Sequence, residues 1–238
     1  LTEHPFAISN MFIIDPLYTL PLLVGVIGTL IPKITAPTAY KINAITLTVS
    51  TLYLCCSLIL KVVIDDKVNT ALQNRDITVN EYISTPAPFT TLLWRVVVMS
   101  DGKYYEGYAS VFDTPNEVTL NAYQTTPSLL NEIKNEWGVK RLQWFTKGFY
   151  SVREQQDKVI LSDSRMGMEC AYVFNFVVGQ KDGSAISVGN FEKISQRPNL
   201  NNLPKIWDRI WHPDTVLASP LAKNTIRDHK ATQGKFGS

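Results

Sequence analysis

The pattern of apolar and polar residues divides the chain into two unlike parts. Residues 11–64 are almost continuously apolar, whereas residues 65–238 have the mixed charge of an ordinary water-exposed domain. Residues 42–64 contain one charge, Lys61, close to the end of the run. A helix needs about 20 apolar residues to cross the hydrocarbon layer, and a lysine near its end can reach the headgroups along its aliphatic stem. We therefore predict a membrane-spanning helix over about residues 42–64.

The first apolar run predicts a second membrane helix over about residues 11–32. Asp15 is followed by Pro16, and proline suits the first helical position because its missing N–H would have no intrahelical partner. Asp15 can cap this helix, and Pro21 predicts a bend inside it. A helix that begins at Pro16 is short for a full crossing, so we expect the residues before it at membrane depth as well. An interrupted helix at that depth has to be covered by protein or line a wet cavity.

Two interpretations of Asp15 stay open. It is the only charged residue between Glu3 and Lys33. The simpler interpretation is a helix cap near the membrane surface. The more specific interpretation is that Asp15 has a functional role, because ionisable side chains inside membrane segments are costly and usually serve function. The spacing of the residues does not decide between them.

Charge gives conflicting indications about the side of the membrane on which residues 65–238 lie. The loop between the predicted helices carries Lys33 and Lys41 and no acid, so the positive-inside rule places it in the cytoplasm and the following domain outside. Residues 193–238 form a basic tail that would instead suit an anionic cytoplasmic leaflet. Because short loops weigh more in this rule, we predict an extracytoplasmic domain. The formal net charge of +2 gives no support to a nucleic-acid partner.

Residues 65–192 are predicted to form an α+β domain with a mostly antiparallel sheet. The clearest signal lies in residues 92–112, where two runs of β-branched and aromatic residues flank the pair Asp101-Gly102. Such a pair suits the tight turn of a two-residue hairpin. Further strands are predicted over residues 117–123, 139–145, 148–154, 158–164 and 171–178. A covering helix is predicted over residues 126–138, which Gly138 would end, and a short amphipathic helix over residues 203–211 of the tail.

The hairpin register predicts an ion pair. With a two-residue loop, Val97 opposes Glu106 and Arg95 opposes Tyr108, so Arg95 and Glu106 are diagonal neighbours on one face of the sheet. If the pair is buried, it can hold the register or belong to a polar site. If it is exposed, it contributes about 0–1 kcal/mol. The structural interpretation is favoured.

A second pair is predicted in residues 162–169, "SDSRMGME". Asp163 and Arg165 are two positions apart, so they share a face if the strand is extended, and Gly167 permits a bend. A structural ion pair at a strand end is the favoured interpretation. The alternative is that Arg165 holds an anionic ligand.

Five motifs in order give the chain a resemblance to a known family. They are "IIDPLYTLPLL", "STPAPFTTLLWRVVVM", "YYEGYASVFD", "RLQWFTKGFYSV" and "LSDSRMGMECAYVFNF". Together they resemble the LexA-binding, inner-membrane-associated hydrolase family, whose members are also described as membrane-bound metal-dependent hydrolases. The resemblance runs from about Asn10 to Phe176. Ser164 and Cys170 depart from the residues usual in the family, and neither departure touches a charged position.

The resemblance implies a bacterial, multi-pass inner-membrane protein with a metal-dependent hydrolase activity. In the family, the histidines and acids of the metal site lie mainly in His-Ser and His-Pro motifs within membrane helices that precede the acid-proline motif. Those helices are not in this sequence, and His4, which precedes the acid-proline motif here, does not match one of those positions. The chain begins with Leu1, and we expect it to be the C-terminal portion of a longer protein whose missing N-terminal helices are its partners in the bilayer. Of the ligand set for zinc or manganese, only Asp15 could belong to this portion.

A non-enzymatic function is the competing class. The sheet domain could recognise a protein or an envelope ligand, with the two helices as a membrane anchor. A catalytic domain should then show a concave pocket with convergent polar groups, and a binding module a broad apolar or aromatic face.

Overall fold

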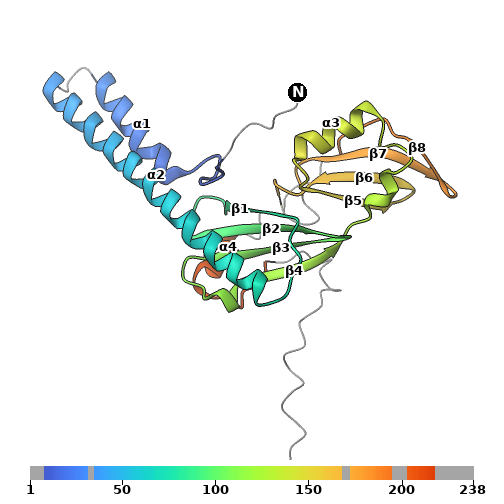
Figure 1. Cartoon of the computed structure of the whole chain (residues 1–238). Coiled ribbons are helices and arrows are strands. Elements are labelled where there is room, and N and C mark those ends of the chain that lie inside the picture. Colours follow the sequence, from blue (N-terminus) through green and yellow to red (C-terminus); the bar gives the residue numbers. More distant parts are fainter. Residues whose placement is uncertain (1–7, 32–34, 168–171, 195–202, 218–238) are drawn as a thin grey trace, which may run out of the picture.

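In the computed structural model, the chain forms a pair of helices followed by two four-stranded sheets (Figure 1). The structure describes residues 8–31, 35–167, 172–194 and 203–217. All strand pairs are antiparallel. The predicted α+β class is therefore confirmed, but the strands that we expected in one sheet form two.

Helix α1 (Pro16–Leu30) begins directly after Asp15, as the cap predicts, but residues 11–15 of the predicted span over about 11–32 are not helical. Asp15 is its N-cap and accepts a hydrogen bond from the Leu17 N–H at 3.0 Å. Pro21 lies inside the helix. With 15 residues, α1 is shorter than the roughly 20 needed to cross the hydrocarbon layer, so a membrane crossing by α1 is not confirmed.

Helix α2 (Ala36–Gln73) is one continuous helix of 38 residues, longer at both ends than predicted. In the part of the chain that the structure describes, it is the one helix long and apolar enough to cross a membrane. It continues past Asp65 because apolar residues keep the helical spacing there. Four of them, Ile64, Val68, Ala71 and Leu72, are buried against the first sheet.

The first sheet has the order β1 (Glu81–Pro86), β2 (Leu93–Ser100), β3 (Lys103–Ser110) and β4 (Thr119–Gln124). The predicted hairpin is confirmed, with Arg95 opposite Tyr108 and Val97 opposite Glu106. Gly102 has a φ of +68°, which the tight turn requires and glycine adopts freely. Trp94, Val96 and Val98 of β2 face α2.

The opposite face of this sheet is covered by α4 (Leu203–Trp211), the short helix predicted in the tail. Ile206 and Ile210 of α4 are buried against Leu93 and Tyr108. The part of the predicted basic tail beyond residue 217 lies outside the described residues.

The second sheet has the order β5 (Tyr150–Gln155), β6 (Lys158–Asp163), β7 (Asn175–Asp182) and β8 (Ala185–Val188). β7 begins later than the predicted strand over 171–178. The core of the second sheet contains Val152, Leu161 and Val178, and it is covered by Leu130 and Val139 from the segment before β5.

Two predictions in this segment are wrong. Residues 126–136 form a short 3-10 helix over Pro127–Leu130 followed by turns, and Gly138, which was expected to end a helix, lies at the start of the next one. Residues 139–145, expected as a strand, lie in helix α3 (Trp137–Thr146). Val139, Leu142 and Thr146 are spaced by three and four residues and turn toward the sheet or into the interior, so the 3.6-residue period governs here and not strand alternation.

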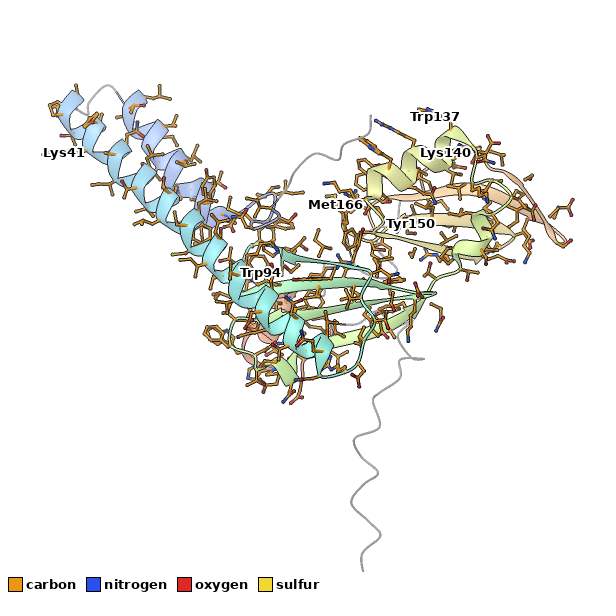
Figure 2. All side chains as sticks on the ribbon, viewed as in Figure 1. Lys41, Trp94, Trp137, Lys140, Tyr150 and Met166 are labelled. Atoms are coloured by element: carbon orange, nitrogen blue, oxygen red, sulfur yellow. The ribbon has the colours of Figure 1, made fainter. Side chains whose placement is uncertain are left out.

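Both helices of the pair expose large apolar side chains. Leu20, Ile27, Leu47 and Ile59 are all exposed, and Figure 2 shows side chains of α1 and of the first half of α2 projecting into open space. Such a surface is unusual for a protein that is surrounded by water.

Candidate functional site

A line of polar side chains follows the face of α2 that meets α1 and the first sheet. It consists of Ser50, Tyr53, Ser57, Lys61 and Asp65, spaced by three or four residues, and we call it the polar track. The Ser50 hydroxyl donates to the Tyr18 carbonyl at 3.0 Å. The Asn10 amide donates to the Ser57 hydroxyl at 2.8 Å. The track therefore binds α1 and the residues before it to α2.

Asp15 lies at the centre of this contact. Its side chain is buried, with an exposed fraction of 2 %. One carboxylate oxygen accepts from the Leu17 N–H, and the other accepts from the Tyr53 hydroxyl at 2.7 Å. The Tyr53 oxygen also lies 3.3 Å from the Thr91 hydroxyl. Three distant segments, namely the start of α1, the middle of α2 and the loop before β2, therefore meet around one oriented carboxylate.

The far end of the track connects α2 to β1. The Lys61 ammonium donates to the Ser84 hydroxyl at 2.9 Å and lies 3.3 Å from an Asp65 carboxylate oxygen. Ser84 in turn donates to Asp65. Lys61, which we expected to reach the headgroups, instead bonds to the sheet, and it marks the point where α2 passes from an exposed apolar surface to the sheet core.

A second polar centre joins the two sheets. The Arg95 guanidinium donates to Glu106 at 2.9 Å within the first sheet. It also donates to the Ser164 carbonyl at 2.8 Å and the Arg165 carbonyl at 3.3 Å, both of which follow β6. The second Glu106 oxygen accepts from the Tyr172 hydroxyl at 2.8 Å. The predicted pair exists, is buried, and holds two sheets together.

Electrostatics within this centre favour the charged pair. Burial lowers the pKa of the Arg95 guanidinium, but the attraction and hydrogen bond of Glu106 outweigh it, so the pKa stays above its ordinary value. Burial, with a smaller contribution from Glu106, raises the pKa of the Tyr108 hydroxyl. Neither group is therefore placed to exchange a proton near neutral pH.

The predicted pair of Asp163 and Arg165 is also present. The Arg165 guanidinium donates to both Asp163 carboxylate oxygens, at 2.9 and 2.6 Å. Since Arg95 donates to the Arg165 carbonyl, the four residues singled out in the two motifs lie at one junction. Their hydrogen bonds are with each other, with the backbone and, for Glu106, with the Tyr172 hydroxyl, which suits a structural role better than an anion site.

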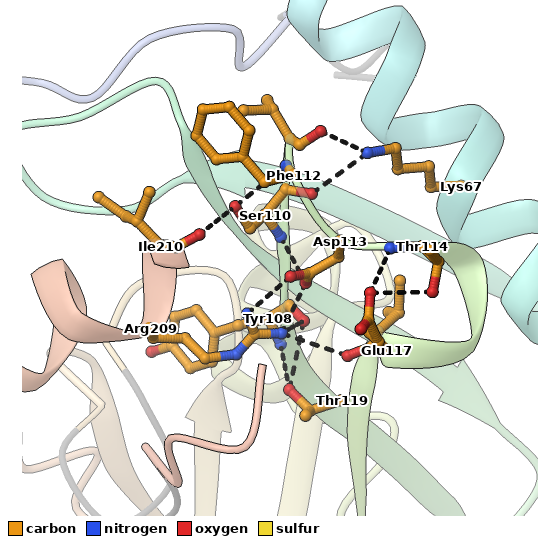
Figure 3. A network of polar contacts seen from close by, with 12 residues as sticks. Lys67, Tyr108, Ser110, Phe112, Asp113, Thr114, Glu117, Thr119, Arg209 and Ile210 are labelled. Atoms are coloured by element: carbon orange, nitrogen blue, oxygen red, sulfur yellow. Dashed lines mark hydrogen bonds and ion pairs between the residues drawn. The ribbon is translucent and has the colours of Figure 1, made fainter. Parts of the chain in front are cut away.

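A third buried pair was not predicted. Arg209 of α4 donates to both oxygens of Asp113, at 3.0 and 2.7 Å, and neither side chain is exposed by more than 1 % (Figure 3). The residues are 96 positions apart in the chain. The only signal in the sequence was a lone arginine beside the two isoleucines on the apolar side of α4.

Asp15 is the one metal-ligand candidate of the sequence that the structure describes. Its two oxygens each accept a hydrogen bond, as ligating carboxylates usually do from outer partners. However, the described residues contain no group of three or more His, Cys, Asp or Glu side chains that could hold a metal ion. His4 and Cys170 lie outside the described residues.

No protein-family model matches the sequence, and no curated protein or solved structure is significantly similar to it.

Proposed function

We propose that the protein is a metal-dependent hydrolase of the bacterial inner membrane, and that Asp15 belongs to its reaction site. The observation that carries the proposal is the Asp15 carboxylate, buried between two apolar helices and held by the Leu17 N–H and the Tyr53 hydroxyl. An ionisable group at membrane depth is costly, which makes a buried acid there a functional candidate by default. The five motifs of the family resemblance support the same activity.

The proposed place of α1 and α2 is inside the bilayer. Exposed apolar side chains on α2 run from Tyr40 to Val63, which corresponds to a length of about 35 Å at 1.5 Å per residue. The hydrocarbon layer is about 30 Å thick. α1 lies against this stretch through Gly25 and Gly28. Because α1 is short, further membrane helices of the same protein would complete the multi-pass arrangement, and the two sheets would lie outside the cytoplasm.

The described residues do not by themselves fit a metal ion, since they bring no group of three or more His, Cys, Asp or Glu side chains together around Asp15. We therefore assign no reaction step to the ion. In the proposal, zinc or manganese would be held by further ligands from other residues of the protein and would supply an acidic bound water. The part of this chain is to orient one carboxylate, which Tyr53 does by donating to it from α2.

The metal content of the purified full-length protein tests this proposal. We expect a stoichiometric divalent metal in the parent and its loss in Asp15→Asn. Asparagine is itself a good N-cap, so α1 should still form, and a circular dichroism spectrum checks this. Asp65→Asn, which changes the acid at the far end of the polar track, is the matched control and should keep the metal.

Two results would contradict the proposal. If Asp15→Asn keeps as much metal as the parent, Asp15 is only a helix cap. If the parent itself binds no metal, the hydrolase activity loses its support, and a membrane-anchored binding module becomes the better account.

A further inference from the structure

Two tryptophans of α4 and a phenylalanine from the turn after β3 form an exposed aromatic surface. The side chains of Trp207, Trp211 and Phe112 are 50 %, 60 % and 56 % exposed. The rings of Phe112 and Trp211 stack, with centroids 4.6 Å apart and planes at 21°. We call these three residues the aromatic face.

The aromatic face is held rigidly. On the other side of α4, Ile206 and Ile210 are buried in the sheet core and Arg209 is paired with Asp113. The Ser110 hydroxyl donates to the Ile210 carbonyl at 2.7 Å, which fixes the end of α4 to the end of β3 (Figure 3). The exposed rings are therefore an ordered feature of the fold and not the consequence of a loose helix end.

Phe112, which belongs to the aromatic face, lies close to the part of α2 that follows its exposed apolar stretch, whereas α4 packs on the opposite face of the first sheet. The Lys67 ammonium donates to the Val111 carbonyl, next to Phe112. Lys67 is four residues beyond Val63, where the exposed apolar stretch ends, and this corresponds to about 6 Å along the helix axis. If α2 spans the bilayer, Phe112 and Trp211 are thus expected near the headgroup region.

We propose that the aromatic face docks into the interface of the bilayer in which α2 is inserted. Tryptophan is enriched at this level because its ring combines an apolar body with a polar N–H. The chain itself brings the bilayer to this surface, since α2 continues from the proposed membrane stretch directly onto the first sheet. This inference rests on the proposed membrane insertion, but not on the metal site. Its consequence is that the first sheet has a fixed orientation against the membrane.

Fluorescence quenching tests the inference in full-length protein reconstituted into phosphatidylcholine vesicles. Lipids that carry bromine on their acyl chains quench tryptophans that reach the interface. We expect the double variant Trp207→Phe/Trp211→Phe to show a clearly smaller quenched fraction than the parent. Trp137→Phe is the matched control, because Trp137 is 78 % exposed but lies on α3 beside the second sheet (Figure 2). It should leave the quenched signal unreduced.

The inference is overturned if the double variant is quenched as strongly as the parent. It is also overturned if the emission of Trp207 and Trp211 is blue-shifted but unquenched, since protein would then cover the face. Flotation of the vesicles separates this failure from failure of the membrane proposal. Protein that floats with the lipid but shows either result refutes only the docking of the aromatic face, whereas protein that does not float refutes insertion as well.

Discussion

Replacing Arg209 by leucine is expected to lower the free energy of unfolding by about 3–5 kcal/mol, the usual cost of removing one partner of a buried ion pair. The variant leaves the Asp113 carboxylate in the interior with no cation in its place. Arg209 also donates to the carbonyls of Tyr108 and Glu117, at 3.2 and 3.3 Å. Denaturant unfolding followed by tryptophan fluorescence measures the effect.

An exposed ion pair supplies the control for this variant. Lys181 and Glu154 are 2.7 Å apart, but both side chains are about one-third exposed. Lys181→Leu should therefore change stability by about 0–1 kcal/mol. If Arg209→Leu costs no more than Lys181→Leu, α4 is not packed on the first sheet as described, and the basis of the aromatic face is lost with it.

Arg95→Leu should be destabilising to a similar extent, about 3–5 kcal/mol, because it leaves Glu106 buried without its cation. It should also loosen the two sheets from each other, since Arg95 donates to the backbone that follows β6. In this variant, the backbone amides around residues 163–167 should exchange hydrogen faster than in the parent. The amides of the β2–β3 hairpin should stay better protected than those of residues 163–167.

A double-mutant cycle distinguishes this junction from a local pair. Tyr172→Phe removes the hydroxyl that donates to Glu106 from the second sheet. If the junction is one network, the effects of Arg95→Leu and Tyr172→Phe should not add, and the coupling energy should be about 0.5–3 kcal/mol. Strictly additive effects would contradict a network that couples the two sheets.

Features fixed by neighbouring residues could be predicted from the sequence. The Asp101-Gly102 turn sets the register of β2 and β3, so the approach of Arg95 to Glu106 follows from counting residues. The Asp15 cap likewise follows from Pro16 in the next position. In both cases the determining contacts are local, and little else in the fold can change them.

Features that depend on distant contacts could not be predicted. The division into two sheets depends on which strands pair, and the strand patterns are alike in both. The segment around α3 was misassigned because Leu142 and Trp144, which flank Gln143, fit strand alternation, whereas the burial of Val139 and Leu142 follows a helical spacing. The contact of Asp15 with Tyr53 joins residues 38 positions apart. The polar track could have been found from the spacing of its residues along α2. The residues to which it bonds could not, because they are distant in the sequence.

The central claim is that the helix pair lies inside a bilayer, because the interpretation of Asp15 and the aromatic face both depend on it. Cys55 and Cys56 are exposed on α2, so their labelling reports the surroundings of this helix directly. We would measure the labelling of these two cysteines in the Cys170→Ser variant, reconstituted into vesicles. A charged maleimide is introduced on both sides of the bilayer by freeze–thawing. The control has Ser184→Cys in place of both helix cysteines, at an exposed turn before β8.

We predict that Cys55 and Cys56 stay unlabelled until detergent is added, whereas the Ser184→Cys thiol reacts at once. A thiol in hydrocarbon meets no charged reagent and does not ionise to the reactive thiolate. Labelling of Cys55 and Cys56 at the rate of the Ser184→Cys control would contradict the account, because α2 would then be exposed to water.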